Sequence, residues 1–454
     1  MLDLFSDRTY AKLFAAQLVS LLGAGIASIA LALKAFDLAG DRAGIALGTI
    51  LTIKMIAYVF LAPVAGALAE RLPRRAMLAA LDAWRAGCAL LLPFADEMWE
   101  VYALIFALQA GSAAFTPAFQ ATIPDVLPDE ARYTRALSLS RLAYDLENIV
   151  SPLLAGILLA LISADALFFG TALGFAGSGA LVLACALPRP GAGAEGEAGE
   201  APRQAPFRVR LTRGVRIYLA TPRLRGLLAV NMAAAATGAM VLINTAPIVR
   251  GVLGMDEQAV AWALGAFGTG SMVAALALPR VLERVGDRPV MLLGGGLAVA
   301  ALLGCAGASG LGGGAPGWAA LLALWGLVGV GYSAALTPSG RLLRRSGHPA
   351  DRPALFAAQF ALSHACWLLA YPLSGWLMTE AGAGAAALVL AGLGVAGLGV
   401  ALAVWPAGDP DEPEHEHPEL PPDHPHLRAH GRGAHHHHPV IIDHLHPHWP
   451  EKRH

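Results

Sequence analysis

The sequence predicts an all-α membrane protein whose twelve transmembrane helices form two pseudo-symmetric six-helix halves. Three observations predict this fold: a shortage of charge, a series of long apolar runs, and a charged loop that occurs twice. Of the 454 residues, 56% are hydrophobic and only 14% are charged, whereas soluble domains carry about 25% charged residues. The charges cluster in loops and in the C-terminal tail, so the stretches between them are more apolar still.

The apolar runs define the expected helices. Each run holds about 20 residues or more, roughly what one helix needs to cross a hydrocarbon core ~30 Å thick. In chain order the twelve expected spans are residues 11–36, 44–69, 76–95, 99–123, 139–162, 166–187, 224–249, 258–282, 288–308, 317–339, 354–379 and 382–405.

A short charged loop follows the second expected span and occurs again after the eighth. Gly66–Arg75 and Pro279–Arg288 share the pattern Glu-Arg-x-(Pro/Gly)-x-Arg at an offset of 213 positions (288 − 75). Ala114–Pro117 is likewise echoed by Ala335–Pro338, 221 positions later (338 − 117). Several matches in the same order indicate a duplicated six-helix unit.

The repeat divides the chain into an N-terminal half (1–187), a linker (188–222), a C-terminal half (223–406) and a His- and Pro-rich tail (407–454). The linker begins with Gly, Ala and Glu, a composition typical of flexible segments. Its second part could form an amphipathic helix on anionic lipid, because it contains Arg203, Arg208, Arg210, Arg213 and Arg216. We expect the tail to be disordered.

Arginine placement predicts the orientation in the membrane. Every second loop is rich in arginine, and the alternate loops carry mainly acids. Cytoplasmic loops have an excess of Lys and Arg, so we expect both termini and the linker to be cytoplasmic. The N-terminus lacks the short apolar core and cleavage site of a signal peptide, and the first helix is therefore expected to stay in the protein.

The duplicated loop resembles the signature of the major facilitator superfamily, Gly-x-x-x-Asp-Arg-x-Gly-Arg-(Arg/Lys). Glu70 stands in place of the Asp and Pro73 in place of the second Gly, and four positions match: Gly66, Arg71, Arg74 and Arg75. Pro117-Ala118, Pro124-Asp125 and the Pro-x-x-Ala-Gly step of the fifth span are similar to the macrolide-efflux and siderophore-exporter branch. The resemblance covers about residues 8–406 and implies transport by alternating access.

The charged loops have two interpretations. They could only anchor the topology, or they could form a gate in which arginines pair with acids and helix ends in one state and release them in the other. Each copy of the loop carries a glutamate at the same position, Glu70 or Glu283. Anchoring the topology does not need a matched acid, so the pattern favours the gate. Asp82 and Arg85 lie three apart and so on one helical face, and we expect them to pair near the gate. The candidate gate residues are Gly66, Glu70, Arg71, Arg74, Arg75, Asp82, Arg85, Glu283, Arg284 and Arg288.

Four charged or titratable residues within the spans are candidates for proton coupling. Asp145 and Glu147 lie in the fifth span, and they could titrate if buried or form a solvated helix start. His364 is near the equivalent place in the second half and is either a proton carrier or a core histidine. Lys54, about ten residues inside the second span, could attract an anionic group or hold an acid.

The resemblance implies a central cavity lined by the first, fourth, seventh and tenth spans. Amides and aromatic rings on an apolar wall suit an amphipathic organic ligand, although ordinary helix packing explains each residue equally well. The residues expected to line the cavity are Gln17, Gln109, Phe115, Asn231, Asn244, Trp325 and Tyr332.

The tail holds thirteen of the fifteen histidines. Imidazole and carboxylate ligands suit Ni²⁺, Zn²⁺ or Co²⁺, and the irregular, Pro-broken spacing indicates several loose sites or a solvated tail that binds metal incidentally. The tail resembles those of nickel-resistance permeases in the same superfamily. Its candidate ligands are His415, His417, His424, His426, His435, His436, His437, His438, His444, His446 and His448.

These observations together predict a secondary transporter in a bacterial-type inner membrane. We expect it to be a proton-coupled exporter of a small amphipathic organic compound, acting as a monomer without a cofactor or nucleic-acid partner. A divalent-metal exporter that uses the tail is the alternative, and a membrane-bound metal sensor or scaffold is a third possibility. The chain shows no catalytic constellation and no phosphate-binding Gly-rich loop, so an enzyme is not expected.

Overall fold

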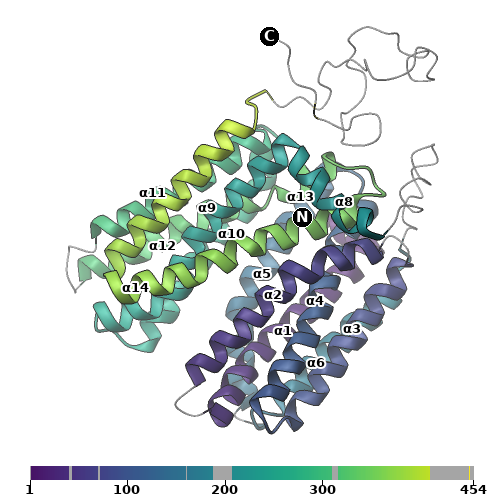
Figure 1. Ribbon diagram of the computed structural model, residues 1–454, viewed down its shortest axis with the longest axis horizontal. Helices are drawn as coiled ribbons and strands as arrows, with labels where there is room; N and C mark the ends of the chain where they lie inside the picture. Colours follow the sequence, from purple (N-terminus) through teal and green to yellow (C-terminus); the bar gives the residue numbers. More distant parts are fainter. Residues whose placement is uncertain are drawn as a thin grey trace.

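The computed structural model describes residues 2–39, 43–69, 72–159, 161–187, 207–308, 315–408 and 449. Within these ranges the chain forms helices and turns and no strand, which confirms the all-α prediction (Figure 1). The linker before residue 207 and the tail from 409 to 448 lie outside the described residues, so their expected bounds stay predictions.

The first half contains six long helices, matching the six expected spans. A short 3₁₀ turn, η1 (Leu2–Ser6), precedes them, and another, η3 (Leu92–Phe94), follows the third. The helix bounds are α1 (Arg8–Ala39), α2 (Ala43–Ala69), α3 (Arg74–Leu91), α4 (Met98–Val126), α5 (Glu130–Leu159) and α6 (Leu167–Leu183).

The second half follows α8 (Phe207–Ala220) and repeats the pattern. A π-helical segment, η4 (Pro247–Val252), extends the first of its long helices, and the short α13 (Ser339–Arg345) precedes the last. The long helices are α9 (Pro222–Ala246), α10 (Glu257–Leu282), α11 (Asp287–Ala308), α12 (Ala315–Leu336) and α14 (Arg352–Val404).

Helix α14 holds two expected spans in one run of 53 residues. Gly382 divides it with φ 79° and ψ 175°, a conformation that is accessible essentially only to glycine. The break falls where the sequence predicts a boundary, between 379 and 382. With α14 counted twice, the structure contains the twelve expected spans.

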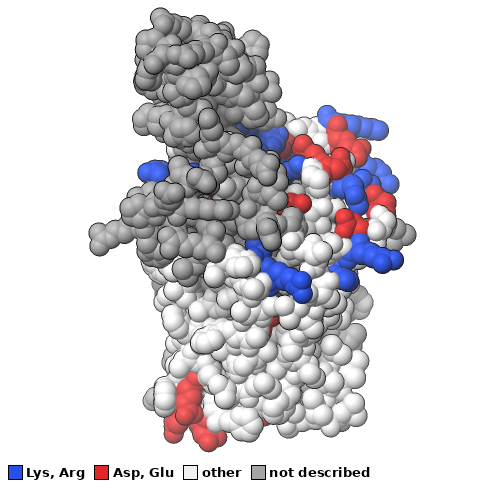
Figure 2. Space-filling view, turned by 90° about the vertical axis from the view of Figure 1, so that its right-hand side faces the viewer, with Lys and Arg blue, Asp and Glu red and all other residues white. Residues whose placement is uncertain are grey.

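The surface is banded as a membrane protein requires. In Figure 2 the Lys, Arg and most acidic side chains gather toward one end, an uncharged belt follows, and acids mark the opposite end. In the described ranges, eight helices are long and apolar enough to cross a membrane, and Thr49–Ala65 and Leu167–Leu183 are shorter apolar helices. Helix α5 completes the set, although it carries several charged residues. The end rich in arginine is called the basic end below.

Each half is held together by its own apolar core. Residues from α1 to α6 form two clusters, and residues from α9 to α14 form the largest one. Glycines allow close helix contacts within each half. A Cβ atom on Gly174 would lie 3.0 Å from the Cα of Gly23, and one on Gly270 would lie 2.0 Å from the carbonyl oxygen of Gly326. Small residues promote such contacts in membranes, where lipid provides no hydrophobic driving force between helices.

The halves meet mainly along two helix pairs, α2 with α14 and α5 with α10, and α4 also contacts α14. In each pair the two helices lie side by side, and both pairs lie between the two groups of helices in Figure 1. Beside the first pair, Ala62 of α2 and Ala113 of α4 pack against Phe360 and Ala361 of α14. Two halves that touch along a few helices can rock against one another.

Helix α8 contacts protein from both halves, α14 and α2. Arg213 Nη2 donates a 3.0 Å hydrogen bond to Asp351, and the Tyr218 hydroxyl donates to Gln359. Tyr218 is fully buried. The basic segment expected to lie on lipid therefore forms a helix in its second part, but Arg213 binds Asp351 of the helical body instead.

One residue of the C-terminal tail, Trp449, packs against the body of the second half. Its ring lies 5.2 Å from the guanidinium of Arg223, which is fully buried at the start of α9. Trp449 adjoins an apolar cluster that also contains Trp405. Trp449 therefore lies beside the start of α9.

Candidate functional site

The basic end is closed by an ion-pair network that joins the two halves. Asp125, in the last turn of α4, pairs with Arg74 at the start of α3 and, at 2.6 Å, with Arg352 at the start of α14. Arg74 is buried, and the side chains of Asp125 and Arg352 are about 15% exposed. One carboxylate thus binds an arginine from each half, which holds this end together.

A second part of the network is centred on Arg341 of α13. Its Nη2 lies 2.6 Å from Glu130 of α5, and its Nη1 donates a 3.0 Å hydrogen bond to the Thr134 hydroxyl. Asp287, at the start of α11, lies 3.1 Å from Arg341 and 3.3 Å from Arg345. Because Glu130 and Arg341 belong to different halves, opening this end must break their contact.

The candidate gate residues are placed in different environments. Arg74 is part of the network, Glu70 and Arg71 lie outside the described residues, and Gly66 lies in α2. In the second copy of the loop, Arg288 Nε donates to the carbonyl oxygen of Trp405 at 3.0 Å. Three candidates are exposed at the surface: Arg75, Glu283 and Arg284.

Most residues of the ion-pair network were not predicted from the sequence. The repeat pattern marks the loops after the second and eighth spans, whereas the partners lie at other helix ends of the same face of the membrane. Asp287 could have been found, because it stands 213 positions after Arg74 (287 − 74) within the same repeat. The missed residues are Asp125, Glu130, Asp287, Arg341, Arg345 and Arg352.

Asp82 and Arg85 form the ion pair expected from their spacing, but deep inside the first half. Both side chains are buried. The Arg85 guanidinium lies 4.0 Å from the ring centroid of Phe115 and 4.4 Å from that of Phe175. Arg85 is eleven residues beyond Arg74 on α3, or roughly 16 Å along the axis. The pair therefore joins α3, α4 and α6 and is not in contact with Arg74 at the gate.

A second candidate site lies midway between the ends, in a layer where the halves meet. Tyr58 of α2 contacts His364 and Phe360 of α14, with ring centroids 4.8 Å apart in both cases. The Tyr58 hydroxyl donates to Gln109 at 3.1 Å. His364 Nδ1 lies 2.7 Å from the carbonyl oxygen of Phe360. Two of the predicted residues, Gln109 and His364, thus meet around Tyr58, which was not predicted.

Lys54 and Glu147 bring opposite charges to the same layer. The Lys54 ammonium lies 5.6 Å from the Tyr58 ring centroid and interacts electrostatically with Glu147 and His364. The Glu147 carboxylate lies against α1, since a Cβ atom on Gly25 would be 2.8 Å from its Oε1. Three of the four coupling candidates are therefore neighbours. Nothing is described for the side chain of Asp145.

An aromatic wall continues the layer into the second half. Tyr332 contacts Phe267 and Trp367, with centroids 5.6 and 6.2 Å apart. Arg141 of α5 lies over Tyr332 at 4.7 Å, and its Nε donates to Ser271 of α10 at 3.2 Å. A cation that stacks on one half while belonging to the other links their motions.

Some of the residues predicted to line the cavity lie in this layer, and the others lie in the interiors of the two halves. Gln17, Gln109 and Tyr332 lie at the layer, where Gln17 accepts a 3.1 Å hydrogen bond from Ser140. The others belong to the interiors of the halves in this structure, and their expected place in the cavity stays a prediction. Phe115 stacks on Phe119, Asn231 bonds the Leu227 carbonyl, Asn244 bonds Ser374, and Trp325 bonds Thr245.

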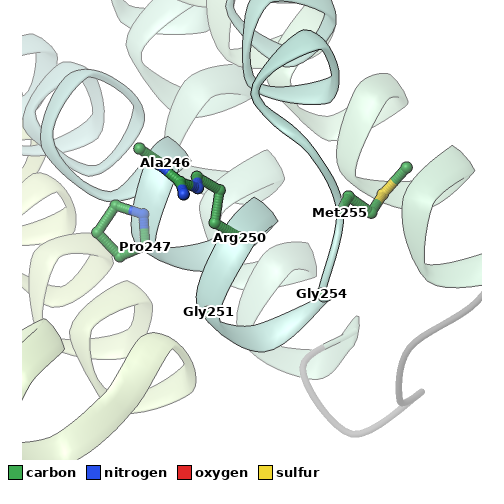
Figure 3. A pocket seen from close by; sticks show the side chains of 6 residues that line it. All are labelled: Ala246, Pro247, Arg250, Gly251, Gly254 and Met255. Carbon is green, nitrogen blue, oxygen red and sulfur yellow. The ribbon is translucent and has the colours of Figure 1, made fainter.

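A hollow of about 570 Å³ lies at the end opposite the ion-pair network (Figure 3). It is formed where α9 passes into the π-helical segment η4. Pro247 has no N–H to donate, which favours a local change of helix type there. The lining residues are Ala246, Pro247, Arg250, Gly251, Gly254 and Met255.

Comparison with known proteins identifies the family. A model of the major facilitator superfamily matches residues 13–240 and 227–443, which together cover most of the chain. The chain belongs to the major facilitator superfamily. The two overlapping matches reproduce the internal repeat. They do not distinguish branches, so the resemblance to the macrolide-efflux and siderophore-exporter branch stays a prediction.

A curated superfamily relative is an uncharacterized transporter, YfiS, of Bacillus subtilis (strain 168). It is 28% identical over 158 residues, which make up 35% of this chain and 37% of that protein. The aligned region thus spans little more than a third of the relative.

Solved superfamily structures share the fold at low sequence identity. The human organic anion transporter MFSD10 (TETRAN) has a TM-score of 0.67 at 14% identity and covers 87% of this chain and 99% of its own. A bacterial homologue of the iron transporter ferroportin, outward-facing with soaked iron, scores 0.68 at 13% and covers 87% and 98%. The E. coli fucose:proton symporter FucP scores 0.64 at 15% with the same coverage. These structures show the fold, and the family match makes the protein a multi-pass membrane member of the major facilitator superfamily.

Proposed function

We propose that this transporter exports a small amphipathic organic compound in exchange for protons. The observation that carries the proposal is the neighbourhood of Glu147, Lys54 and His364 in the layer between the halves, beside the aromatic groups of Tyr58 and Tyr332. Acid, base and aromatic surface in one layer suit a ligand with an apolar body and a polar group.

Transport would proceed by rocking of the two halves about this layer. The pairs Asp125–Arg352 and Glu130–Arg341 close the basic end, and their rupture would open it while the opposite end closes. The arginine excess supports a cytoplasmic position for this end in a bacterial inner membrane, with both chain termini on that side. Export then means loading from the basic end and release at the end bearing the hollow near Arg250.

Glu147 is the proposed proton carrier. A charged carboxylate is costly away from water, whereas a protonated one is not. Proton uptake by Glu147 would remove its attraction for Lys54, and release would restore it, so that the layer changes net charge by one unit in each cycle. This difference lets a proton gradient bias the equilibrium between the two states.

Metal export remains the alternative because of the histidines of the tail. Imidazole and carboxylate groups from His415 to His448 suit Ni²⁺, Co²⁺ or Zn²⁺, and these residues lie outside the described part of the chain. In the part that is described, no three His, Cys, Asp or Glu side chains gather into a metal site. The similar solved structures are an organic anion transporter, a bacterial homologue of an iron transporter and a fucose:proton symporter, so the fold alone does not choose between the two.

A growth challenge tests the proposal. A host without its own exporters would produce the full chain, Glu147→Gln, or a truncation after Trp405, and would be exposed to a drug panel and to Ni²⁺, Co²⁺ and Zn²⁺. We expect drug resistance that is lost in Glu147→Gln and kept in the truncation. Metal resistance lost with the truncation would favour the metal exporter.

Inverted vesicles give the matching biochemical test. Substrate efflux in the intact cell corresponds to uptake here, driven by an imposed pH gradient. Glu147→Gln should abolish this gradient-driven uptake while leaving substrate exchange without a gradient. If the variant kept full gradient-driven transport, proton coupling through Glu147 would be wrong. If no compound or metal were moved, a sensor or scaffold role would become the better interpretation.

A further inference from the structure

A small cavity lies inside the ion-pair network at the basic end, between the two halves. Its volume is about 140 Å³, the space that roughly four or five water molecules occupy in the liquid. The first turns of α5 and α14 form part of its wall, and α13 forms the rest. The lining residues are Glu130, Tyr133, Arg341, Arg344, Arg345 and Arg352.

The side chains around this cavity carry more positive than negative charge. Five arginines of the network, counted among the described residues, share three carboxylates. This leaves two positive charges in excess (5 − 3). Arg344 contributes to the excess because its Nη2 donates to the carbonyl oxygen of Pro128 and its guanidinium lies 5.5 Å from the Tyr133 ring centroid. The charge could be balanced by one doubly charged anion.

Several donors on the lining residues have no hydrogen-bond partner in the described part of the chain. They include the Tyr133 hydroxyl, Arg344 Nη1 and Arg352 Nε, and these three atoms are buried. Tyr133 is fully buried, and Gly340 leaves room for its hydroxyl, since a Cβ atom there would lie 2.6 Å from it. Leaving a buried donor unpaired is unfavourable, so these donors indicate an acceptor in the cavity.

Tyr133 precedes the span expected from residue 139, and burial raises the pKa of its hydroxyl. The hydroxyl therefore keeps its proton near neutral pH and can only be a neutral donor to an anion. Guanidinium groups are well suited to phosphate because they donate in a fixed planar geometry.

We propose that this cavity binds a phosphate group, with Tyr133, Arg344 and Arg352 as its donors. Because Tyr133 belongs to the first half and both arginines to the second, a bound phosphate stabilises the state in which the basic end is closed. The group could come from free inorganic phosphate or from the headgroup of an anionic lipid. Neither source depends on which substrate the transporter carries.

The test uses the purified full chain and inorganic phosphate, with chloride at equal ionic strength as the reference. We expect phosphate to raise the melting temperature in a saturable manner and to slow hydrogen exchange in residues 128–135 and 341–352. Arg344→Gln should weaken phosphate binding at least tenfold, or about 1.4 kcal/mol. Tyr133→Phe, which removes one oxygen only, should weaken it several-fold. The exposed Arg225→Gln is the matched control and should bind as the unaltered protein does.

Vesicles distinguish the two sources of the phosphate group. The protein would be reconstituted in phosphatidylcholine alone or with phosphatidylglycerol. Protection by phosphatidylglycerol without an effect of free phosphate identifies a lipid headgroup, and the reverse identifies the free ion. The proposal is overturned if neither protects, if chloride acts as phosphate does, or if Arg344→Gln and Tyr133→Phe, both folded, bind phosphate with unchanged affinity. Binding that persists while transport fails would count against the proposed function alone.

Discussion

Arg74 and Asp287 occupy equivalent positions in the two halves but carry opposite charges. They lie 213 positions apart (287 − 74), at the starts of α3 and α11. Arg74 binds Asp125 near the end of α4, and Asp287 binds Arg345 in α13, just beyond α12. The duplicated unit thus keeps an ion pair at the same place in both halves while exchanging the charges. The pair of the first half reaches across to the second through Arg352.

Asp125→Asn should shift the transporter away from the state closed at the basic end. The change removes the charge that binds Arg74 and Arg352, and a hydrogen bond to a charged group contributes about 1.5–3 kcal/mol. A cysteine at position 137, which lies at the contact of α5 with Gly340, would report opening through its reaction with a water-soluble maleimide. We expect faster labelling in Asp125→Asn. Glu283→Gln, which alters an exposed acid at the same end, should leave the labelling rate unchanged, and equal rates in all three proteins would contradict the gate.

Arg85→Leu should destabilise the first half strongly. It leaves the buried Asp82 without its partner, and breaking a buried pair by removing one member costs about 3–5 kcal/mol. Replacing both residues, as Asp82→Leu with Arg85→Leu, removes the uncompensated charge and should recover much of the loss. Thermal unfolding in detergent measures the stability of the single and the double variant. A double variant as unstable as the single one would show that the pair matters for packing more than for charge.

The helix boundaries could be predicted from the sequence because they depend on local properties. A span needs a long apolar run, and a boundary needs a charge, a proline or a glycine such as Gly382. The pairing of Asp82 with Arg85 was equally local, since residues three apart share a helical face. Each of these features is encoded within one segment of about 25 residues.

The site was harder to predict for two physical reasons. In a membrane helix the faces toward lipid and toward protein are both apolar. The sequence therefore did not show that Phe115 and Trp325 are packed in the interiors of their halves. The ion pairs between halves join residues far apart in the chain, as Asp125 and Arg352 are, and no local pattern relates them. The repeat was the available signal, and it identified the correct end of the molecule but few of the partners.

Gly25→Ala should impair the contact of α1 with α5 at the layer between the halves. The new Cβ would lie 2.1 Å from the Ser151 hydroxyl oxygen and 2.8 Å from Glu147 Oε1, so the helices must separate. Overpacking of this kind costs about 1–3 kcal/mol, and here it also displaces the proposed proton carrier. We expect a lower melting temperature and a loss of gradient-driven transport that is larger than the lower stability alone would cause.

Two further variants control this prediction. Ser151→Gly in the Gly25→Ala background makes room for the added methyl group and should restore part of both properties. Gly170→Ala adds a methyl group where no atom lies within 4 Å and should have little effect. Normal transport by Gly25→Ala would mean that α1 and α5 have more freedom at this point than the close contact implies.

Trp449→Ala should lower the stability of the second half, although residue 449 lies near the end of a tail. The guanidinium of Arg223 is fully buried beneath the Trp449 ring, and a cation–π contact contributes ~2 kcal/mol or more when it is desolvated. Removing the ring also exposes part of the apolar cluster around Trp405. Thermal unfolding of Trp449→Ala should therefore begin at a lower temperature, and hydrogen exchange should increase at the start of α9. A truncation after Trp405 removes the same ring and should lower the unfolding temperature at least as much. If both variants unfolded as the full chain does, Trp449 would add nothing to stability, and the tail could only act through its histidines.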